Sequence, residues 1–256
     1  MSDRSASDSR VSEVTPHATP RTAVVWAVLR AELDRRPAGP LQILDAGGGS
    51  GQFAVPLAEL GHRVTVVDAS PDALAALERR AAERGVGEWI TGVQGDADSI
   101  LHVVEPASQD IVLCHSVLEV VDEPAAVLGP VAQAVRPGGC ASILLANRHA
   151  TVLSRALGGH FADAAHALGD PDGRWGPADV ALRRYDLAEA TDLLAAAGLD
   201  VESVHGVRVV ADLVPGALLD SEPGAIEALL ELEVAASARS PYREIATQLH
   251  LLARRP

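Results

Sequence analysis

Short apolar runs alternate along the chain with stretches whose apolar residues recur at helical spacing, beginning at residue 41. Such runs are typical of strands buried on both faces, and the stretch after each run supplies a crossover helix. The pattern predicts strands over residues 41–46, 63–68, 89–94, 110–114, 140–146, 199–208 and 247–254. It predicts helices up to about residue 60, near residue 99, and over 71–84, 124–135, 187–197 and 222–238. This alternation indicates an α/β fold, a seven-stranded mixed sheet with helices on both faces and the last strand antiparallel.

The alternation lapses over residues 147–184 and again over 209–242. Because ligands of open α/β sheets bind beyond the carboxyl ends of the strands, we interpret both segments as insertions that build a ligand pocket. Residues 1–20 are rich in Ser, Asp, Thr and Pro and contain no apolar run. We expect a disordered leader there rather than a secretory signal, followed by a single domain over 21–256. No uncharged apolar run reaches the roughly 18 residues of a membrane-spanning helix.

The formal net charge of −14 argues against indiscriminate binding to nucleic acid or acidic membranes. All 21 basic residues are Arg, a usage that indicates a GC-rich genome rather than anion recognition. The two cysteines, Cys114 and Cys140, fall in predicted strands, so we expect buried thiols in a reduced cytoplasm. Neither has clustered His or Cys neighbours. We therefore expect a cytoplasmic protein with no metal site and no membrane partner.

A glycine-rich turn, Asp45-Ala46-Gly47-Gly48-Gly49-Ser50-Gly51, follows the first predicted strand and opens a helix. Glycine lets the backbone turn sharply and approach a ligand without a clash at Cβ. Asp68 ends the next predicted strand, where its carboxylate can accept hydrogen bonds from both hydroxyls of a ribose. A nicotinamide site would have glycine at position 52, which is Gln52 here. The pattern therefore favours a nucleoside cofactor of another class.

This D-x-G-x-G-x-G form resembles the S-adenosylmethionine (SAM) motif of class I methyltransferases, which share a Rossmann-like fold. The resemblance implies that SAM is the cofactor and that it is held by Asp45 and by the glycines Gly47, Gly48, Gly49 and Gly51.

Related enzymes hold the adenine through a carboxylate and a backbone N–H that follow the third strand. Asp96 and Ala97 stand at that place here. Asp96 could instead cap the short helix predicted near residue 99.

Several further blocks resemble the bacterial tRNA 5-carboxymethoxyuridine methyltransferase family. They are Asp45 to Gln52, His115-Ser116-Val117-Leu118-Glu119, Asn147 with His149, Gly206 to Val209, Pro241-Tyr242 and His250 to Arg254. The resemblance extends from about residue 21 to residue 255. That family uses SAM to esterify the carboxylate of a modified wobble uridine.

The resemblance implies further roles, position by position. Arg21, five residues before Trp26, would bind the SAM carboxylate, and the fork of a guanidinium suits that pairing. Gly47 and Gly48 would form the cofactor loop, and Asp68 would bind the ribose. Ala97 would contact the adenine through its backbone. For Arg21 a surface position near a helix start is the alternative.

His115 stands at the carboxyl end of the fourth predicted strand, where the methyl donor should lie. We consider it as a proton-shuttling catalytic base, a SAM contact or a packed core histidine. Glu119 and His149 are the other residues placed to act as a base. A carboxylate acceptor is already ionised at neutral pH and needs no base, so the absence of an obvious one is compatible with such an acceptor.

The segment between Asn147 and Tyr185 has five Arg and four Asp, a formal charge of about +1 in an otherwise acidic chain. This asymmetry favours an anionic acceptor, either a tRNA anticodon loop or a small-molecule carboxylate. Arg148, His149, Arg184 and Arg208 are the acceptor-side candidates.

Basic runs and aromatic platforms for RNA are scarce. A small-molecule O- or carboxyl methyltransferase of specialised metabolism therefore remains an alternative. A non-catalytic SAM-binding module is a weaker one.

Overall fold

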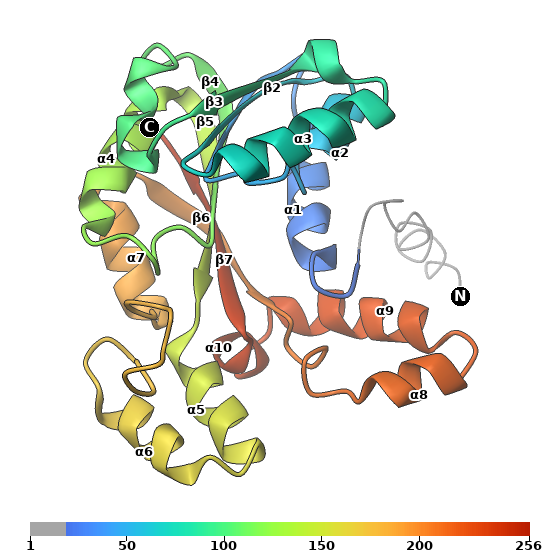
Figure 1. The fold of residues 1–256 in the computed structure, drawn as a ribbon, viewed down its shortest axis with the longest axis vertical. Helices are drawn as coiled ribbons and strands as arrows, with labels where there is room; N and C mark the ends of the chain where they lie inside the picture. The colour runs from blue at the N-terminus through green and yellow to red at the C-terminus, as the bar shows by residue number, and fades with distance from the viewer. Residues whose placement is uncertain (1–18) are drawn as a thin grey trace, which may run out of the picture.

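The computed structural model describes residues 19–256, so residues 1–18 of the predicted leader lie outside the described part of the chain. A seven-stranded sheet with the order β3-β2-β1-β4-β5-β7-β6 forms its centre (Figure 1). The first five strands pair in parallel, and β7 is antiparallel to both of its neighbours. The predicted fold class and the antiparallel last strand are confirmed. The strands are β1 Gln42–Ala46, β2 Arg63–Asp68, β3 Ile90–Gln94, β4 Gln109–His115, β5 Val135–Ala146, β6 Asp200–Val207 and β7 Gln248–Arg254.

The beginning of β5 differs most from the prediction, since this strand starts at Val135 rather than at Cys140. The turn-forming run Pro137-Gly138-Gly139 led to a later expected start. In the structure this run sits inside an irregular first part of the strand. The register with β4 shifts there, from Gln109↔Val135 to Ile111↔Cys140. The Pro-Gly-Gly run thus forms a bulge within the strand and does not end it.

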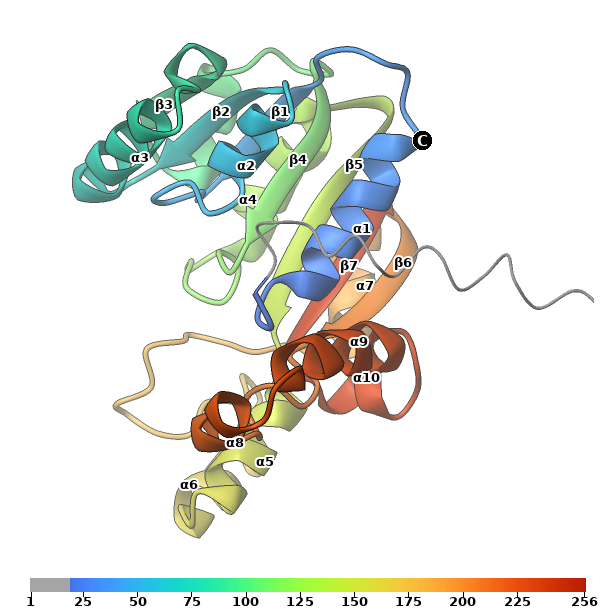
Figure 2. The same ribbon diagram turned by 90° about the vertical axis from the view of Figure 1, so that its right-hand side faces the viewer.

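Helices cover both faces of the sheet (Figure 2). Successive strand residues point to opposite faces, so Ile43 belongs to the core cluster that includes residues of α1, α2 and α3, whereas Leu44 belongs to the cluster that includes residues of α4 and α7. The helices are α1 Ala23–Asp34, α2 Ala54–Glu59, α3 Pro71–Glu83, α4 Pro124–Ala134, α5 Arg148–Leu157, α6 Phe161–Gly169, α7 Leu187–Ala196, α8 Gly216–Ser221, α9 Ala225–Ser237 and α10 Tyr242–Ile245. Short 3₁₀ turns, η1 Gly87–Trp89 and η2 Ala97–His102, flank β3. Cys114 and Cys140 are free and buried, as expected.

The two predicted insertions contain helices that stand beyond one edge of the sheet (Figures 1 and 2). The first contains α5 and α6 and follows β5, and the second contains α8 and α9 and follows β6. Buried polar side chains hold both segments. The Glu233 carboxylate accepts hydrogen bonds from three successive backbone N–H groups, at residues 209–211. Asn147 donates to the backbone oxygens of Glu244 and Ala246 at 2.8 and 2.7 Å.

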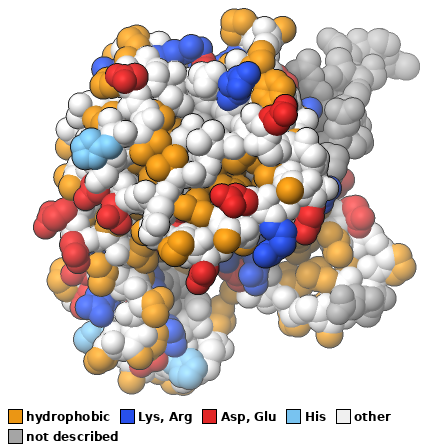
Figure 3. Space-filling model, turned by 45° about the horizontal axis from the view of Figure 1, so that its top comes forward, with side chains coloured by type: hydrophobic (Ala, Val, Ile, Leu, Met, Phe, Trp, Pro, Cys, Tyr) orange, Lys and Arg blue, Asp and Glu red, His pale blue; other side chains and the backbone are white. Residues whose placement is uncertain are grey.

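The surface shows no single-sign region on the face seen in Figure 3, where acidic and basic side chains of the described residues are interspersed. No helix among residues 19–256 is both long and apolar enough to cross a membrane.

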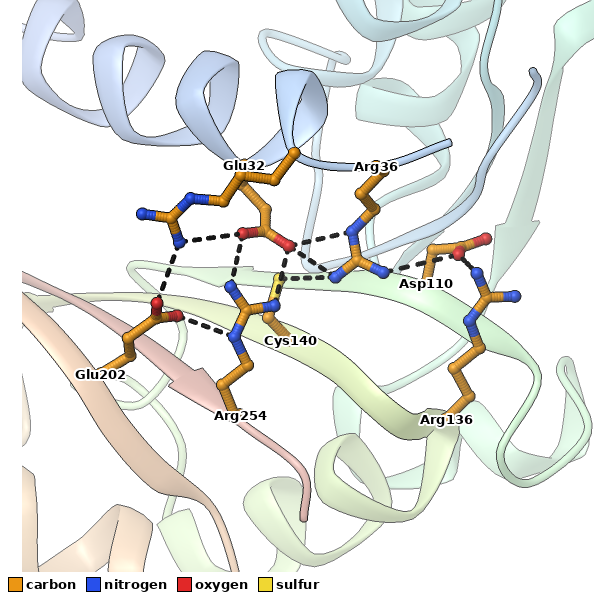
Figure 4. A network of polar contacts seen from close by, with 8 residues as sticks. Glu32, Arg36, Asp110, Arg136, Cys140, Glu202 and Arg254 are labelled. Carbon is orange, nitrogen blue, oxygen red and sulfur yellow. Dashed lines mark hydrogen bonds and ion pairs between the residues drawn. The ribbon is translucent and has the colours of Figure 1, made fainter. Parts of the chain in front are cut away.

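A polar network ties α1 to the far half of the sheet (Figure 4). Glu32 of α1 accepts hydrogen bonds from Arg36, at 2.9 and 2.6 Å, and from Arg254 of β7, at 2.8 and 2.6 Å. Burial works to raise the pKa of Glu32, but the hydrogen bonds and charges of the two arginines outweigh it and lower that pKa. Glu202 of β6 also binds Arg254, at 2.7 Å, and Asp110 of β4 pairs with Arg36.

Candidate cofactor and acceptor sites

The glycine-rich turn leads from β1 into α2 with a backbone that only glycine adopts without strain. Gly47 has φ +76°, and its N–H donates to the Val67 oxygen of β2 at 2.7 Å. A Cβ at Gly48 would lie 2.5 Å from the carboxyl carbon of Asp45. The turn is therefore tied to the neighbouring strand and closely packed on its own acid.

Asp45 lies at the floor of this turn and is buried. Burial first, and then the nearby charge of Asp68, raises its pKa to about 7. The Asp45 carboxyl therefore packs against the backbone of the turn.

Asp68 ends β2 beside the same turn. Its Oδ2 accepts from the Gly49 N–H at 2.8 Å, and its Oδ1 accepts from the Ser70 N–H at 2.9 Å. A Cβ at Gly49 would meet only this carboxylate, at 3.8 Å, so the loop leaves space directly over the acid. Both oxygens are held in place, and each retains lone pairs that can accept hydroxyl donors.

Asp96 and Ala97 follow β3 at the start of η2. Asp96 occupies the N-cap position, but its side chain makes no capping hydrogen bond. The exposed Asp96 carboxylate therefore does not cap the helix, which was the alternative role considered for it.

His115 ends β4 next to the glycine turn and belongs to a buried chain of polar side chains. Its Nε2 lies 2.8 Å from the Ser142 hydroxyl, which lies 2.7 Å from Nε2 of His250. The His115 ring packs edge-on to Phe53 at 4.7 Å. Burial lowers the pKa of His115 to about 3, so the imidazole is neutral at physiological pH. Its Nδ1 has no hydrogen-bond partner among the described residues.

A pocket of about 1120 Å³ opens beyond the carboxyl ends of β4 and β5, between the two insertions. Ser116 and Glu119 line it from the segment after β4, and Arg184 and Arg208 line it from elsewhere in the chain. Arg148 and His149 do not line this pocket. Arg148 donates to the Pro171 oxygen at 2.6 Å and pairs with Glu189 at 3.0 Å. The Nδ1 of His149 lies 3.2 Å from the Glu244 oxygen.

Arg21 is exposed and lines a groove beside this pocket, together with Thr19, Ala211 and Arg208. Arg208 lines both spaces, so the N-terminal arginine and the acceptor-side candidate share one surface. Among residues 19–256 no group of His, Cys, Asp and Glu is arranged to hold a metal ion.

Similarity to known proteins identifies the family. A family model described as a methyltransferase domain matches residues 44–143, which include the glycine turn, Asp68 and His115. The tRNA 5-carboxymethoxyuridine methyltransferase of Escherichia coli (strain K12) is 31% identical over 237 residues, 92% of this chain and 88% of that protein. This chain belongs to the class I SAM-dependent methyltransferases. The match supports an enzyme rather than a non-catalytic SAM-binding module.

Other similar proteins have different names. The ubiquinone biosynthesis O-methyltransferase of Methylocella silvestris is 31% identical over 71% of this chain and 66% of that protein. A SAM-dependent methyltransferase from Mesorhizobium loti has a TM-score of 0.59 and 21% identity, covering 91% of this chain and 98% of that one. The [4+2]-cyclase SpnF reaches a TM-score of 0.61 at 19% identity, over 91% and 82%. Since a cyclase shares the fold, the fold alone does not specify the reaction.

The residues at the glycine turn fit SAM, the cofactor that the family implies. The turn leaves space over Asp68, the Asp96 carboxylate is uncommitted, and Nδ1 of His115 is unpaired among the described residues. These groups lie at the carboxyl ends of β1 to β4, the usual ligand edge of such a sheet.

Asp68→Ala is expected to weaken SAM binding by about tenfold or more, because Asp68 is the expected acceptor for two ribose hydroxyls and the loop loses its anchor at Gly49. Isothermal titration calorimetry with SAM measures the change. Asp72→Ala, which removes an exposed acid from the first turn of α3, is the matched control and should keep wild-type affinity. Equal affinities of both variants would place the ribose elsewhere.

Proposed function

We propose that this methyltransferase transfers the methyl group of SAM to a carboxylate, that of a 5-carboxymethoxyuridine at the wobble position of tRNA. The observation that carries the proposal is the 31% identity to the Escherichia coli enzyme of that name, which extends over 92% of this chain. An alignment of that extent includes most of the residues that line the acceptor pocket. The proposal places the enzyme in the cytoplasm, where tRNA is modified.

In this proposal the loop Gly47–Gly51 and Asp45 surround the methionine part of SAM, and Asp68 binds the ribose. Asp96 and Ala97 hold the adenine. Arg21 binds the SAM carboxylate from the groove that it shares with Arg208, and its fork geometry suits a carboxylate.

When bound, SAM supplies an electrophilic methyl group, and the protein has to align the acceptor oxygen with it. His115 contacts SAM as a neutral imidazole through Nδ1. Because burial lowers its pKa to about 3, it holds a proton poorly, which supports a positioning role over that of a base. Such a site suits a carboxylate acceptor, which has no proton to lose.

Arg184 and Arg208 give the acceptor pocket its positive groups. We assign Arg148 and His149 to the support of this pocket, since the Arg148 guanidinium donates to the backbone oxygen of Arg184 at 3.2 Å and His149 contacts the segment before β7. The acceptor partner is anionic in this account.

A small-molecule acceptor is the second candidate, favoured by the apolar rim of the pocket. Several large apolar side chains line it and are exposed: Val120, Leu153, Leu157, Val180, Leu213 and Ile245. None of the described lining residues is aromatic. A rim of this kind suits a small molecule with an apolar body better than it suits stacked bases.

Mass spectrometry of tRNA nucleosides from a strain that lacks the gene tests the proposal. We expect loss of the methyl ester and accumulation of the free carboxymethoxy nucleoside, with recovery on re-expression of the wild type but not of the Asp68→Ala variant. An unchanged nucleoside profile would favour the small-molecule acceptor and leave the SAM site intact.

A further inference from the structure

Glu119 is a buried acid in the wall of the acceptor pocket. It lies four residues beyond the end of β4, and the residue is 6% exposed. Its backbone oxygen accepts from the Leu182 N–H at 2.8 Å, which fixes the chain at this point. The side-chain Oε2 has no hydrogen-bond partner among the described residues. A buried, unpaired carboxyl oxygen next to a ligand space is costly unless the ligand pairs with it.

The arginines of the pocket are already paired with other acids. Arg184 donates to both oxygens of Asp179, at 2.6 and 2.9 Å, and to the Gly173 oxygen at 3.1 Å. Arg208 lies 3.4 Å from Asp212. Neither guanidinium makes an ion pair with Glu119, so an ionised Glu119 would have no cation in direct contact among the described residues.

The groups that face Glu119 support its neutral form. Burial raises its pKa to about 7. Hydrogen bonds from the backbone of Glu119 itself, the Ser116 side chain and the backbone of Ala146, together with the charge of Arg184, counteract burial only in part. The other titratable groups near it are Cys114 and Tyr185, both of which are neutral at pH 7 because burial raises the pKa of each. The Tyr185 hydroxyl donates away from the pocket, to the Leu118 oxygen at 3.0 Å.

We infer that Glu119 binds the acceptor as a neutral carboxylic acid and donates a hydrogen bond to the acceptor oxygen that is not methylated. The inference rests on the proposed carboxylate acceptor. Two carboxylates in contact cannot both be ionised at low cost, so a single proton shared between them is the stable arrangement. The remaining acceptor oxygen forms the new O–C bond as the S–C bond of SAM breaks, and the electron pair stays on sulfur. The proton stays on Glu119 throughout, and the ester product is neutral.

This role predicts a pH dependence with a definite sign. The competent form of Glu119 is protonated, so kcat/KM for the acceptor should fall as the pH rises above about 7. Glu119→Gln keeps an N–H donor at the same place and should retain activity within about threefold at pH 7, with a flat profile up to pH 9. Glu119→Ala loses the donor and should raise KM for the acceptor about tenfold or more, with little change in kcat.

The assay uses the full chain, SAM, and tRNA prepared from the strain that lacks the gene. The affinity for S-adenosylhomocysteine, measured for each variant, controls for misfolding and should be unchanged. Glu123→Gln is the matched control, since Glu123 is exposed and lies four residues further along the chain, directly before α4. Its profile should follow that of the wild type. Loss of transfer in Glu119→Gln, together with wild-type activity that rises with pH, would overturn the inference and assign Glu119 as the base for a hydroxyl acceptor.

Calorimetry with 5-carboxymethoxyuridine as the probe separates this inference from the proposed function. Binding at pH 8, in buffers of different ionisation enthalpy, should take up close to one proton in the wild type and none in Glu119→Gln. Binding without proton uptake in either protein overturns the role of Glu119 and leaves the carboxylate acceptor intact. If the wild type neither binds the nucleoside nor methylates the tRNA, the carboxylate acceptor and the inference fail together.

Discussion

Gly47→Ala is expected to lower the affinity for SAM by about 100-fold or more, through strain and steric overlap in the turn that we propose as the cofactor loop. The φ of Gly47 is +76°, where a side chain costs on the order of 1 kcal/mol or more. A Cβ there would also lie 2.4 Å from Cγ2 of Val117, which is itself part of the core. Since the Gly47 N–H is tied to the Val67 oxygen, the loop can relieve the overlap only by leaving its position. Equilibrium dialysis with labelled SAM measures the loss.

Gly61→Ala is the matched control for this substitution. Gly61 has φ +88°, and a Cβ there would meet nothing within 4 Å. This variant should lose about 1 kcal/mol of stability from backbone strain and bind SAM as tightly as the wild type. The difference in SAM affinity between the two variants separates the effect on the glycine turn from the general cost of a side chain at positive φ. Wild-type SAM affinity in Gly47→Ala would contradict the assignment of the glycine turn.

The strands and the glycine turn were predictable because their signals are local. A strand such as Arg63–Asp68 is an apolar run bounded by a turn and a helix cap, and its bounds were predicted without error. Ser70 caps α3 by accepting from the Ala73 N–H at 3.2 Å, with Pro71 at the first helical position, as the sequence indicates. The resemblance to class I methyltransferases rested on the glycine turn in this half of the chain, whereas the blocks shared with the tRNA methyltransferase family extended to Arg254.

The acceptor side was less predictable because it depends on contacts between distant segments. Arg148 and Arg184 are both basic residues of the same insertion, yet only Arg184 lines the pocket. Arg148 instead donates to the backbone oxygens of residues 171 and 184 and forms an ion pair with Glu189. No local sequence pattern predicts these partners. Glu119 could be considered as a base from its position after the fourth strand, but its burial depends on tertiary contacts, such as the hydrogen bond from the Leu182 N–H of the first insertion to its backbone oxygen.

The network around Glu32 could not be foreseen either, because its members come from α1, β4, β6 and β7. Glu32 lies on a helix that precedes the first predicted strand, and Arg254 lies two residues before the end of the chain. Their hydrogen bonds span 222 positions of sequence. In this way the two ends of the described chain stabilise each other, and the helix that follows Arg21 is fixed against the sheet.

Glu32→Ala is expected to destabilise the protein by about 3–5 kcal/mol, because it leaves two largely buried arginines without their shared carboxylate. The side chains of Arg36 and Arg254 are only 10% and 27% exposed, so water replaces the lost partner poorly. The midpoint and slope of urea unfolding, followed by circular dichroism, give the change.

Glu202→Ala is the matched control, since it removes another acid that binds Arg254 but is itself 36% exposed. The free energy of unfolding of this variant should fall by no more than about 1 kcal/mol, because an exposed ion pair contributes little to stability. If the free energy of unfolding of Glu32→Ala fell by less than about 1 kcal/mol, the arginines would have found other partners. The network would then not be what holds α1 in place. A large loss of stability in Glu32→Ala, with SAM affinity unchanged where the variant is fully folded, would separate the support of α1 from the proposed binding of SAM by Arg21. The two residues lie within a dozen positions of each other.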